Sequence, residues 1–433
     1  MKLGGTDMHE GIECSCVGGY ASLPGGNATR RIDLIRKIVT ILLVVFVFFN
    51  AIPGTTTIKE VCFYLSFLLF VVALVLFRER IDLKSPVSLA LCVYALWAGA
   101  SFFWTLDRGN TLHHLIWHLM KGLLLYVVIV HFIKTRKGVN SLGVVVVLSS
   151  LLITVLLMYK HFVVTGAGFR VKMATYYPEL AVNWIAYTVV FAIAIVLAFG
   201  RKERGLLINF LSVFVLAGFF VILYLTQSRS AVLAMLVAVA LMSVLQNKKF
   251  IILLVTIILV VGIFGPVKNK SKFDRVCSDA RVAINYASYE IMKDYPFGVG
   301  YGAEIYGTRL DLVEYYKRIP PGIDNKNKIF KDPHSLLFSI GVRLGFVGVV
   351  LFVCLIVTFA VMCWRMVRFS GDEFVRRWAL ALLAGFIGFM IVAFVEPAGT
   401  HYVDNVFFII LALGTSVWRI RDLSSCCDRY LSL

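Results

Sequence analysis

Charged residues are scarce in this sequence, and the acidic ones are fewer than the basic ones. Of 433 residues only 16% are charged, with 25 Asp or Glu against 43 Lys or Arg, whereas 60% are apolar. Soluble domains are typically about 45–50% apolar and about 25% charged. The shortage of charge excludes a soluble enzyme, a disordered protein and a nucleic-acid-binding module, and it indicates a polytopic membrane protein.

Several motifs of catalysis and ligand binding are also missing. The sequence has no G-x-x-x-x-G-K-[ST] phosphate loop, no Asp-x-Asp pair on an outer loop and no G-x-S-x-G elbow. Nucleotide hydrolysis and metal-assisted transfer from a nucleotide sugar are therefore unsupported. The nine cysteines are scattered, and their odd number argues against a disulfide framework. We expect neither a metal nor a cofactor, and no cleavable signal is evident in residues 1–29.

What the chain has instead is a series of continuous apolar runs. A bilayer core needs roughly 20 apolar residues per helix, and barrel strands would alternate in polarity instead. Twelve runs are candidates: 32–52, 60–77, 86–103, 111–133, 143–163, 181–199, 206–225, 230–246, 250–267, 335–363, 378–396 and 403–418. We therefore predict an all-α polytopic membrane protein with about 12 transmembrane helices and both termini on the same side.

The distribution of basic residues predicts which side that is. With a cytoplasmic N-terminus, the inner segments hold 23 Lys and Arg and the five short outer turns hold 5. Cytoplasmic turns collect basic residues, so both termini are predicted to be cytoplasmic. The net charge of +18 has the same explanation and needs no nucleic-acid partner. The predicted organisation is a cytoplasmic tail (1–31), nine helices (32–267), a periplasmic loop (268–334), three helices (335–418) and a second cytoplasmic tail (419–433).

The long outer segment 268–334 is the expected carrier of function, because it is the one sizeable soluble piece. Val276, Ala280, Ile284, Ala287 and Ile291 recur at helical spacing and predict a helix that ends before Pro296. A second helix is predicted over 303–318.

Two arginines are candidates for binding an anion. Arg229 lies in the very short outer turn TQSRS and opens the next helix. Its alternative role is that of an interfacial arginine whose charged end reaches water. Arg281 lies on the first loop helix and is followed by YPFGVGYG at 295–302, whose glycines could let the backbone approach a phosphate. A Rossmann interpretation fails because no strand precedes these glycines.

A histidine at the other end of the loop is the candidate general base. His334 lies in KDPHSLLFSIGVRLG, where the loop meets the next helix, and Pro333 suits a helix start. The positive end of the helix dipole disfavours an imidazolium ion, and a neutral ring is what a general base requires. The alternative is an interfacial histidine without a catalytic role.

A polar stripe on the fourth predicted helix is a further candidate site. His114, His118 and Lys121 are spaced by four and three residues, which places them on one face. A zinc site would need a third ligand, and none is apparent. We therefore favour the interpretation that this polar face lines a cavity filled by water or by a lipid headgroup. Arg343, inside a predicted helix, and Arg170, in an outer turn, are possible secondary contacts of the donor or acceptor.

Taken in order, the motifs resemble the bacterial O-antigen ligase and polymerase family. The resemblance rests on S-R at 228–229 opening a helix, on Arg281 about fifteen residues before YPFGVGYG, and on D-P-H-S-L-L-F-S-I-G-V-R-L-G-F-V-G. It covers mainly residues 205–350. It implies a glycosyltransferase of the bacterial inner membrane, active on the periplasmic face in lipopolysaccharide biosynthesis. The implied partners are an undecaprenyl-diphosphate-linked glycan as donor, lipid A–core as acceptor and membrane lipid.

The resemblance also implies roles for three residues in a metal-independent inverting transfer. His334 would deprotonate the acceptor hydroxyl, while Arg229 and Arg281 would hold the diphosphate. The chain departs from the family in carrying Ser335 where Asn is frequent and Arg343 where Glu is frequent. Arg343 is then either an extra phosphate contact or the partner of an intramembrane acid such as Glu396.

An O-antigen ligase is the leading hypothesis, and three others remain open. An O-antigen or exopolysaccharide polymerase would use a second lipid-linked glycan as acceptor, and an oligosaccharide transferase would use a protein. From another class, a polysaccharide transporter or flippase would show inverted repeats and helices broken near mid-membrane. The sequence indicates neither feature.

Overall fold

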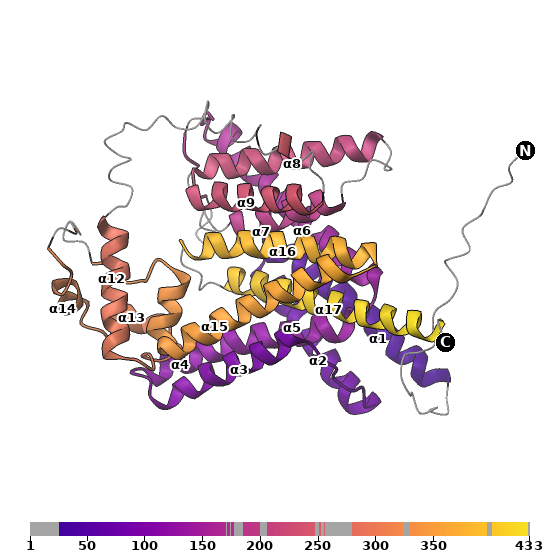
Figure 1. Cartoon of the computed structure of the whole chain (residues 1–433), viewed down its shortest axis with the longest axis horizontal. Helices are drawn as coiled ribbons and strands as arrows, with labels where there is room; N and C mark the ends of the chain where they lie inside the picture. The colour runs from indigo at the N-terminus through magenta and orange to yellow at the C-terminus, as the bar shows by residue number, and fades with distance from the viewer. Residues whose placement is uncertain are drawn as a thin grey trace, which may run out of the picture.

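The computed structural model is helical, and no β-strand occurs in the part of the chain that it describes. The described residues are 26–169, 171–173, 175–176, 185–199, 206–246, 251–252, 255, 279–321, 323, 329–395 and 401–431. Figure 1 shows most helices running along the long axis of the molecule, with α12, α13 and α14 gathered at the end opposite the two termini.

The first half of the chain supplies most of the bundle. Its elements are α1 (Gly26–Asn50), α2 (Thr56–Phe77), α3 (Pro86–Ala100), the 3₁₀ turn η1 (Ser101–Phe103), α4 (Arg108–His114), the π-helical segment η2 (Leu115–Met120), α5 (Lys121–Phe132), α6 (Arg136–Tyr159), the π-helical segment η3 (Lys160–Val164), α7 (Ile185–Phe199), α8 (Leu206–Thr226) and α9 (Arg229–Leu245). The second half contributes α12 (Asp279–Asp294), α13 (Ile305–Thr308), α14 (Leu312–Lys317), α15 (Leu336–Phe369), α16 (Glu373–Ala393) and α17 (His401–Leu431).

Local signals explain where several of these helices begin. The Ser85 hydroxyl accepts from the Ser88 amide at 3.0 Å, and Pro86 follows it as the first helical residue of α3. The Thr135 hydroxyl accepts from Gly138 N at 3.1 Å at the start of α6. These side chains satisfy amide donors that have no partner inside the helix, and proline is well tolerated in the first turn.

The apolar runs form helices, and their lengths are those of membrane spans. Among the described residues, eight helical stretches are long and apolar enough to cross a bilayer, from α2, α3, α4–α5, α6, α8, α15, α16 and α17. Two more, α7 and α9, are apolar but have only 15 and 17 residues. The predicted run 250–267 lies almost entirely outside the described residues. The protein is a polytopic helical membrane protein, while the total of about twelve spans stays a prediction.

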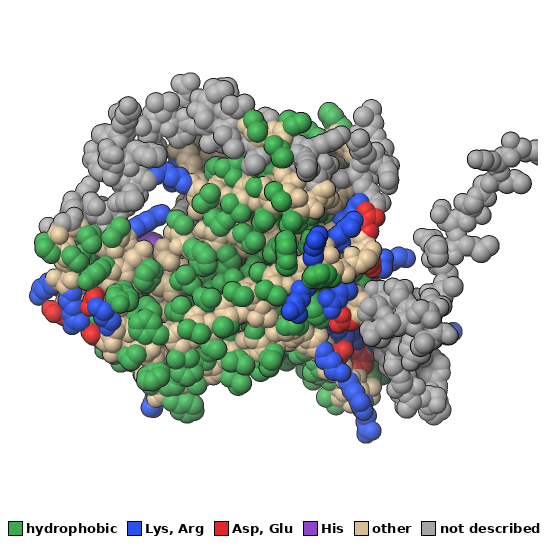
Figure 2. Space-filling view, viewed as in Figure 1, with side chains coloured by type: hydrophobic (Ala, Val, Ile, Leu, Met, Phe, Trp, Pro, Cys, Tyr) green, Lys and Arg blue, Asp and Glu red, His purple; other side chains and the backbone are tan. Residues whose placement is uncertain are grey.

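The visible surface has the polarity that a bilayer requires. Figure 2 shows hydrophobic side chains over the middle of this face, with Lys, Arg, Asp and Glu gathered at its two ends. Large apolar side chains such as Leu76, Leu96 and Val350 are 60–70% exposed. A wide band of outward-facing apolar surface is stable in hydrocarbon, whereas the same surface would be costly in water.

Helix α16 lies at the centre of the bundle, in contact with α7, α9, α15 and α17. Its most apolar window is 78% buried, whereas the corresponding window of α2 is 28% buried. Small residues make the close crossing with α7 possible. A Cβ at Gly385 would lie 2.3 Å from the Phe191 ring, and one at Gly388 would lie 2.4 Å from Val190 Cγ1. Close helix crossing through small residues is typical of packing in membranes.

The segment before α15 has its own small core. Helix α12 confirms the predicted loop helix, and Ile284, Ala287 and Ile291 on it are at most 1% exposed. They pack with Tyr306 and Val342 in a second hydrophobic cluster.

The single helix predicted over 303–318 is wrong. Two short helices, α13 and α14, replace it, separated by Arg309–Asp311. The Asp311 carboxylate accepts from the Glu314 amide at 3.4 Å, so this residue starts a new helix instead of continuing the first.

Candidate functional site

Helix α15 is broken at Gly345, and the break shapes the site. Gly345 has φ 69° and ψ −169°, which lie outside the helical region and are accessible essentially to glycine alone. Figure 1 shows the two parts of α15 meeting at a sharp angle. No pattern in the sequence had indicated this break.

The irregular segment 295–302 fills this break and replaces the lost helical hydrogen bonds. Val299 N donates to Val342 O at 2.9 Å, Gly300 N donates to Arg343 O at 3.0 Å, and Phe346 N donates to Pro296 O at 3.0 Å. The Trp97 indole donates to Leu344 O at 3.0 Å. Irregular backbone at membrane depth requires such partners, because hydrocarbon offers none.

The glycines of YPFGVGYG serve this packing and do not form an open phosphate cradle. A Cβ at Gly298 would lie 2.4 Å from Arg343 O, and one at Gly300 would lie 2.0 Å from Thr105 Oγ1. A Cβ at Gly302 would meet Asn110 Oδ1 at 2.1 Å. Protein atoms already occupy the space that we expected a phosphate to use, so that interpretation of the glycines is wrong.

His334 lies two residues before the first residue of α15. Its side chain is half-buried, and its ring meets Phe330 edge-on with centroids 5.6 Å apart. No hydrogen bond engages the imidazole within the part of the chain described here. The helix begins at Leu336, with Ser335 as the extended residue before it, and Pro333 is buried. Both ring nitrogens of His334 therefore remain available to a ligand at a loop–helix junction.

The two candidate arginines also lie at the starts of helices. Arg229 is the first residue of α9, after the capping residue Ser228, and Arg281 is the third residue of α12. Both side chains are exposed. In Figure 1, the N-terminal ends of α12 and α15 lie toward the end of the molecule opposite the termini. Helix N-termini carry partial positive charge, so an anion is favoured there and an arginine is not.

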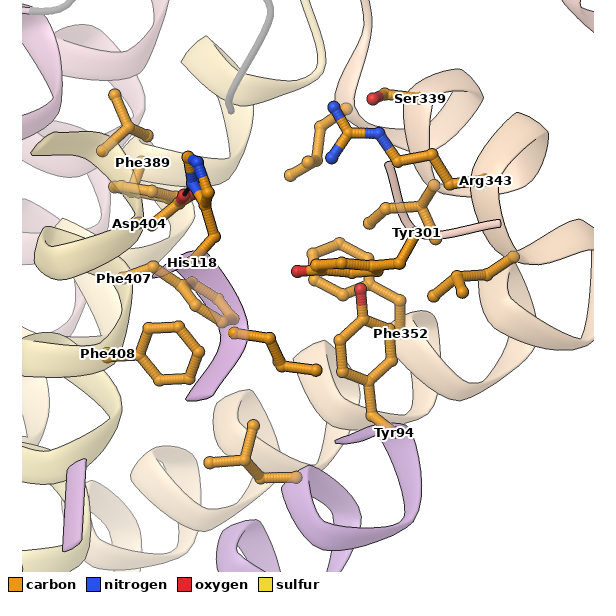
Figure 3. Close-up of a pocket in the computed structure, with 16 residues that line it drawn as sticks. Tyr94, His118, Tyr301, Ser339, Arg343, Phe352, Phe389, Asp404, Phe407 and Phe408 are labelled. Atoms are coloured by element: carbon orange, nitrogen blue, oxygen red, sulfur yellow. Dashed lines mark hydrogen bonds and ion pairs between the residues drawn. The ribbon is translucent and has the colours of Figure 1, made fainter. Parts of the chain in front are cut away.

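A cavity of about 70 Å³ lies inside the bundle, beside the start of α15. Its lining comes from α3, η2, α15, α16 and α17 and from the segment 295–302. Figure 3 shows its polar groups on two opposite walls: His118 and Asp404 on one, Arg343 and Ser339 on the other. Leu336, the first residue of α15, also lines it, which places the cavity close to His334 along the chain.

Each wall of this cavity has a distinct chemistry. His118 Nδ1 and Asp404 Oδ2 are 2.7 Å apart, with side chains 10% and 26% exposed. Figure 3 shows the Arg343 guanidinium directed into the cavity from the facing wall, with the Tyr301 ring between the two walls. Tyr301 lies outside the helical spans, and burial raises the pKa of its hydroxyl, so it stays protonated and can donate a hydrogen bond. The cavity offers two hydrogen-bond donors and one cation to a ligand.

The predicted stripe of His114, His118 and Lys121 does not line one cavity. The His114 and His118 rings stack with centroids 4.6 Å apart, and His118 faces Asp404. Lys121 turns away and pairs with Glu60 on α2. The helix is π-helical over Leu115–Met120, which alters the regular spacing on which the prediction rested.

Each of these two pairs contains an acid that the sequence did not lead us to predict, Asp404 for His118 and Glu60 for Lys121. Asp404 and Glu60 each stand near the start of a predicted apolar run, where an ionisable side chain is itself a signal of a site. They could have been identified in this way, although their partners could not. Arg170 and Glu396, the other predicted contacts, lie outside the described residues. No group of three or more His, Cys, Asp or Glu that could hold a metal comes together within the described ranges.

Comparison with known protein families gives a match to part of the chain. Residues 213–353 match the family described as O-antigen ligase. This stretch contains Arg229, Arg281, His334 and Arg343 and ends inside α15. No curated protein matches the chain.

Proposed function

Because residues 213–353 match the family described as O-antigen ligase, we propose that this membrane protein is an O-antigen ligase. The proposed reaction transfers a glycan from undecaprenyl diphosphate to a sugar hydroxyl of lipid A–core, on the periplasmic face of the bacterial inner membrane. The family match is the observation that carries the proposal. The helical bundle supports it, since an enzyme with candidate membrane spans can bind a donor that is held in the bilayer by its lipid.

The proposed orientation places the end with α12, α13 and α14 in the periplasm. Its basis is the count of Lys and Arg, 23 in the segments that would then be cytoplasmic against 5 in the short outer turns; a further 12 lie in the long outer segment. We assign residues 268–334 as the periplasmic loop, with about twelve spans and both termini in the cytoplasm. Arg229, Arg281 and His334 would then lie on the donor's side of the membrane.

In the proposed mechanism His334 acts as the general base. An imidazole nitrogen accepts the proton of the acceptor hydroxyl as its oxygen attacks the anomeric carbon of the donor sugar. The bond from that carbon to the diphosphate oxygen breaks, and attack from the opposite side inverts the anomeric configuration. The half-buried position of His334 and its lack of a hydrogen bond among the described residues support this role.

Arg229 and Arg281 are proposed to stabilise the leaving diphosphate. Negative charge builds on the diphosphate oxygens as the sugar leaves, and arginine binds such oxygens through a planar fork that keeps its charge. The positive ends of α9 and α12 would add to this stabilisation. An anion bound there would also offset the unfavourable placement of two cations at helix N-termini.

The test uses the purified full chain with a lipid-diphosphate glycan and lipid A–core, and detects the product by its size shift. We expect His334→Ala to lower turnover by roughly two to four orders of magnitude. Arg229→Lys and Arg281→Lys should each cost on the order of 2–4 kcal/mol of transition-state stabilisation, because lysine keeps the charge and loses the fork.

Matched controls are His113→Ala and Arg136→Lys, which change exposed side chains outside the site. Both should keep their activity. Full activity in His334→Ala, or in both lysine variants of the site, would refute the assigned roles. A ladder of lengthened lipid-linked glycans, formed without lipid A–core, would instead identify a polymerase.

A further inference from the structure

The guanidinium of Arg343 makes no hydrogen bond or ion pair with the part of the chain that the structure describes. Within the described ranges no hydrogen bond, ion pair or ring contact engages it, although it is half-buried and directed into the cavity. A cation at membrane depth is costly unless something compensates its charge. A half-buried arginine that faces a cavity, with no partner among the described residues, therefore marks a candidate site for an anion.

The nearest acid in the cavity does not meet this need. Asp404 faces Arg343 across the cavity but pairs with His118 at 2.7 Å on its own wall. Asp404 is therefore engaged by a side chain on its own wall, and no hydrogen bond or ion pair joins it to Arg343 among the described residues.

The size of the cavity restricts the class of ligand. A volume of about 70 Å³ is space for roughly five water-sized groups, at about 10–15 Å³ each. A phosphate group, with five heavy atoms, fits this space.

The walls are suited to a phosphate that carries an apolar chain. Beside Arg343 stands the Ser339 hydroxyl, and the Tyr301 hydroxyl also lines the space. The rings of Phe352, Phe407 and Phe408 make up much of the rest of the lining. The guanidinium fork matches phosphate oxygens, the hydroxyls can donate to them, and the aromatic rings favour an apolar ester over a fully hydrated ion.

We propose that this cavity is a second phosphate site, separate from Arg229 and Arg281, in which Arg343 binds a phosphate group with Ser339 and Tyr301 as additional donors. The ligand class is a phosphate anion, supplied by a lipid phosphate or as free phosphate. That a bound lipid would be a polyprenyl carrier is the one part of this inference that rests on the proposed function. Anion binding itself does not depend on it.

The experiment measures binding to the purified full chain in detergent by calorimetry. The probes are geranylgeranyl phosphate, inorganic phosphate and the uncharged geranylgeraniol. An Arg229→Gln, Arg281→Gln double variant serves as the background, so that the proposed diphosphate contacts do not contribute. Arg343→Gln in this background should weaken phosphate binding roughly tenfold to a hundredfold, the effect of losing hydrogen bonds to a charged group.

Further variants separate charge from shape and from folding. Arg343→Lys should lose less affinity than Arg343→Gln, and Ser339→Ala should lose a few-fold through one hydroxyl. Arg136→Gln, which removes an arginine that is 54% exposed at the other end of the bundle, should change nothing. His334→Ala should bind the phosphate probes normally while losing turnover. Phosphate binding therefore tests the Arg343 site, and turnover separately tests the proposed reaction.

The outcomes decide the proposal and the source of the ligand. Arg343-dependent binding of geranylgeranyl phosphate alone identifies a lipid phosphate, and Arg343-dependent binding of inorganic phosphate identifies the free anion. Equal affinity for the uncharged alcohol would overturn the proposal. So would unchanged phosphate affinity in both Arg343→Gln and Ser339→Ala.

Discussion

Replacing Gly345 with alanine should open the joint between the two parts of α15. The substitution adds one methyl group at a backbone position with φ 69° and ψ −169°. That methyl carbon would lie 2.0 Å from Pro296 O and 2.5 Å from the Phe297 carbonyl carbon. Both neighbours are backbone atoms, so no side-chain rotation can relieve the clash.

The magnitude follows from the conformation and from the bonds that the clash displaces. An alanine held in this region of φ and ψ costs about 1–3 kcal/mol. Moving segment 295–302 away breaks the hydrogen bonds of Val299 N, Gly300 N and Phe346 N, at about 0.5–1.5 kcal/mol each. The joint should therefore lose about 3–7 kcal/mol. At about 1.4 kcal/mol for each factor of ten, the opening equilibrium shifts by a hundredfold or more.

Hydrogen exchange measures this opening directly. The amides of Val299, Gly300 and Phe346 should exchange at least about a hundredfold faster in Gly345→Ala than in the parent protein. Gly99→Ala is the control, because nothing lies within 4 Å of the added carbon in α3. Glycine is unfavourable within a helix, so this control should be neutral or slightly stabilising. Unchanged exchange at the three amides, with an unchanged melting temperature, would refute our account of the break.

Two further predictions concern stability and topology. The hydrogen bond from His131 and the charge of Arg36 lower the pKa of Glu79 to about 2, so this carboxylate stabilises the fold above about pH 4.5 and loses its effect as pH falls toward 2. Glu79→Gln should lower stability by about 1–3 kcal/mol at pH 7. In thermal melts in detergent, the difference in melting temperature between Glu79→Gln and the parent protein should narrow as the pH falls below 4.5. Glu314→Gln is the exposed control. A difference that stays constant with pH would contradict this account of Glu79. In a cysteine-free background, Lys317→Cys, at a side chain that is 71% exposed, should react with an impermeant reagent in intact cells. Arg136→Cys should react only after permeabilisation, and the reverse pattern would invert the proposed topology.

The sequence by itself determined the class of the protein and most of its helices. Continuous apolar runs predicted membrane helices because the bilayer forces each buried backbone segment to satisfy its own hydrogen bonds, which is a local property. Helical spacing likewise predicted α12, whose Ile284, Ala287 and Ile291 are buried. The resemblance to the O-antigen ligase family followed from motifs whose order and spacing are readable without a structure, and residues 213–353 match that family. The roles of His334, Arg229 and Arg281 stay predictions.

The tertiary structure decided what depends on partners far apart in the chain. The His118–Asp404 pair joins residues 286 positions apart, and the Trp97 indole meets Leu344 O over 247 positions. Gly345 breaks α15 only because segment 295–302 supplies replacement hydrogen bonds, so no pattern within α15 could predict it. The cavity with Arg343 exists because five helical elements and one loop segment meet there. Packing between distant segments sets such geometry, whereas local periodicity sets only the helices themselves.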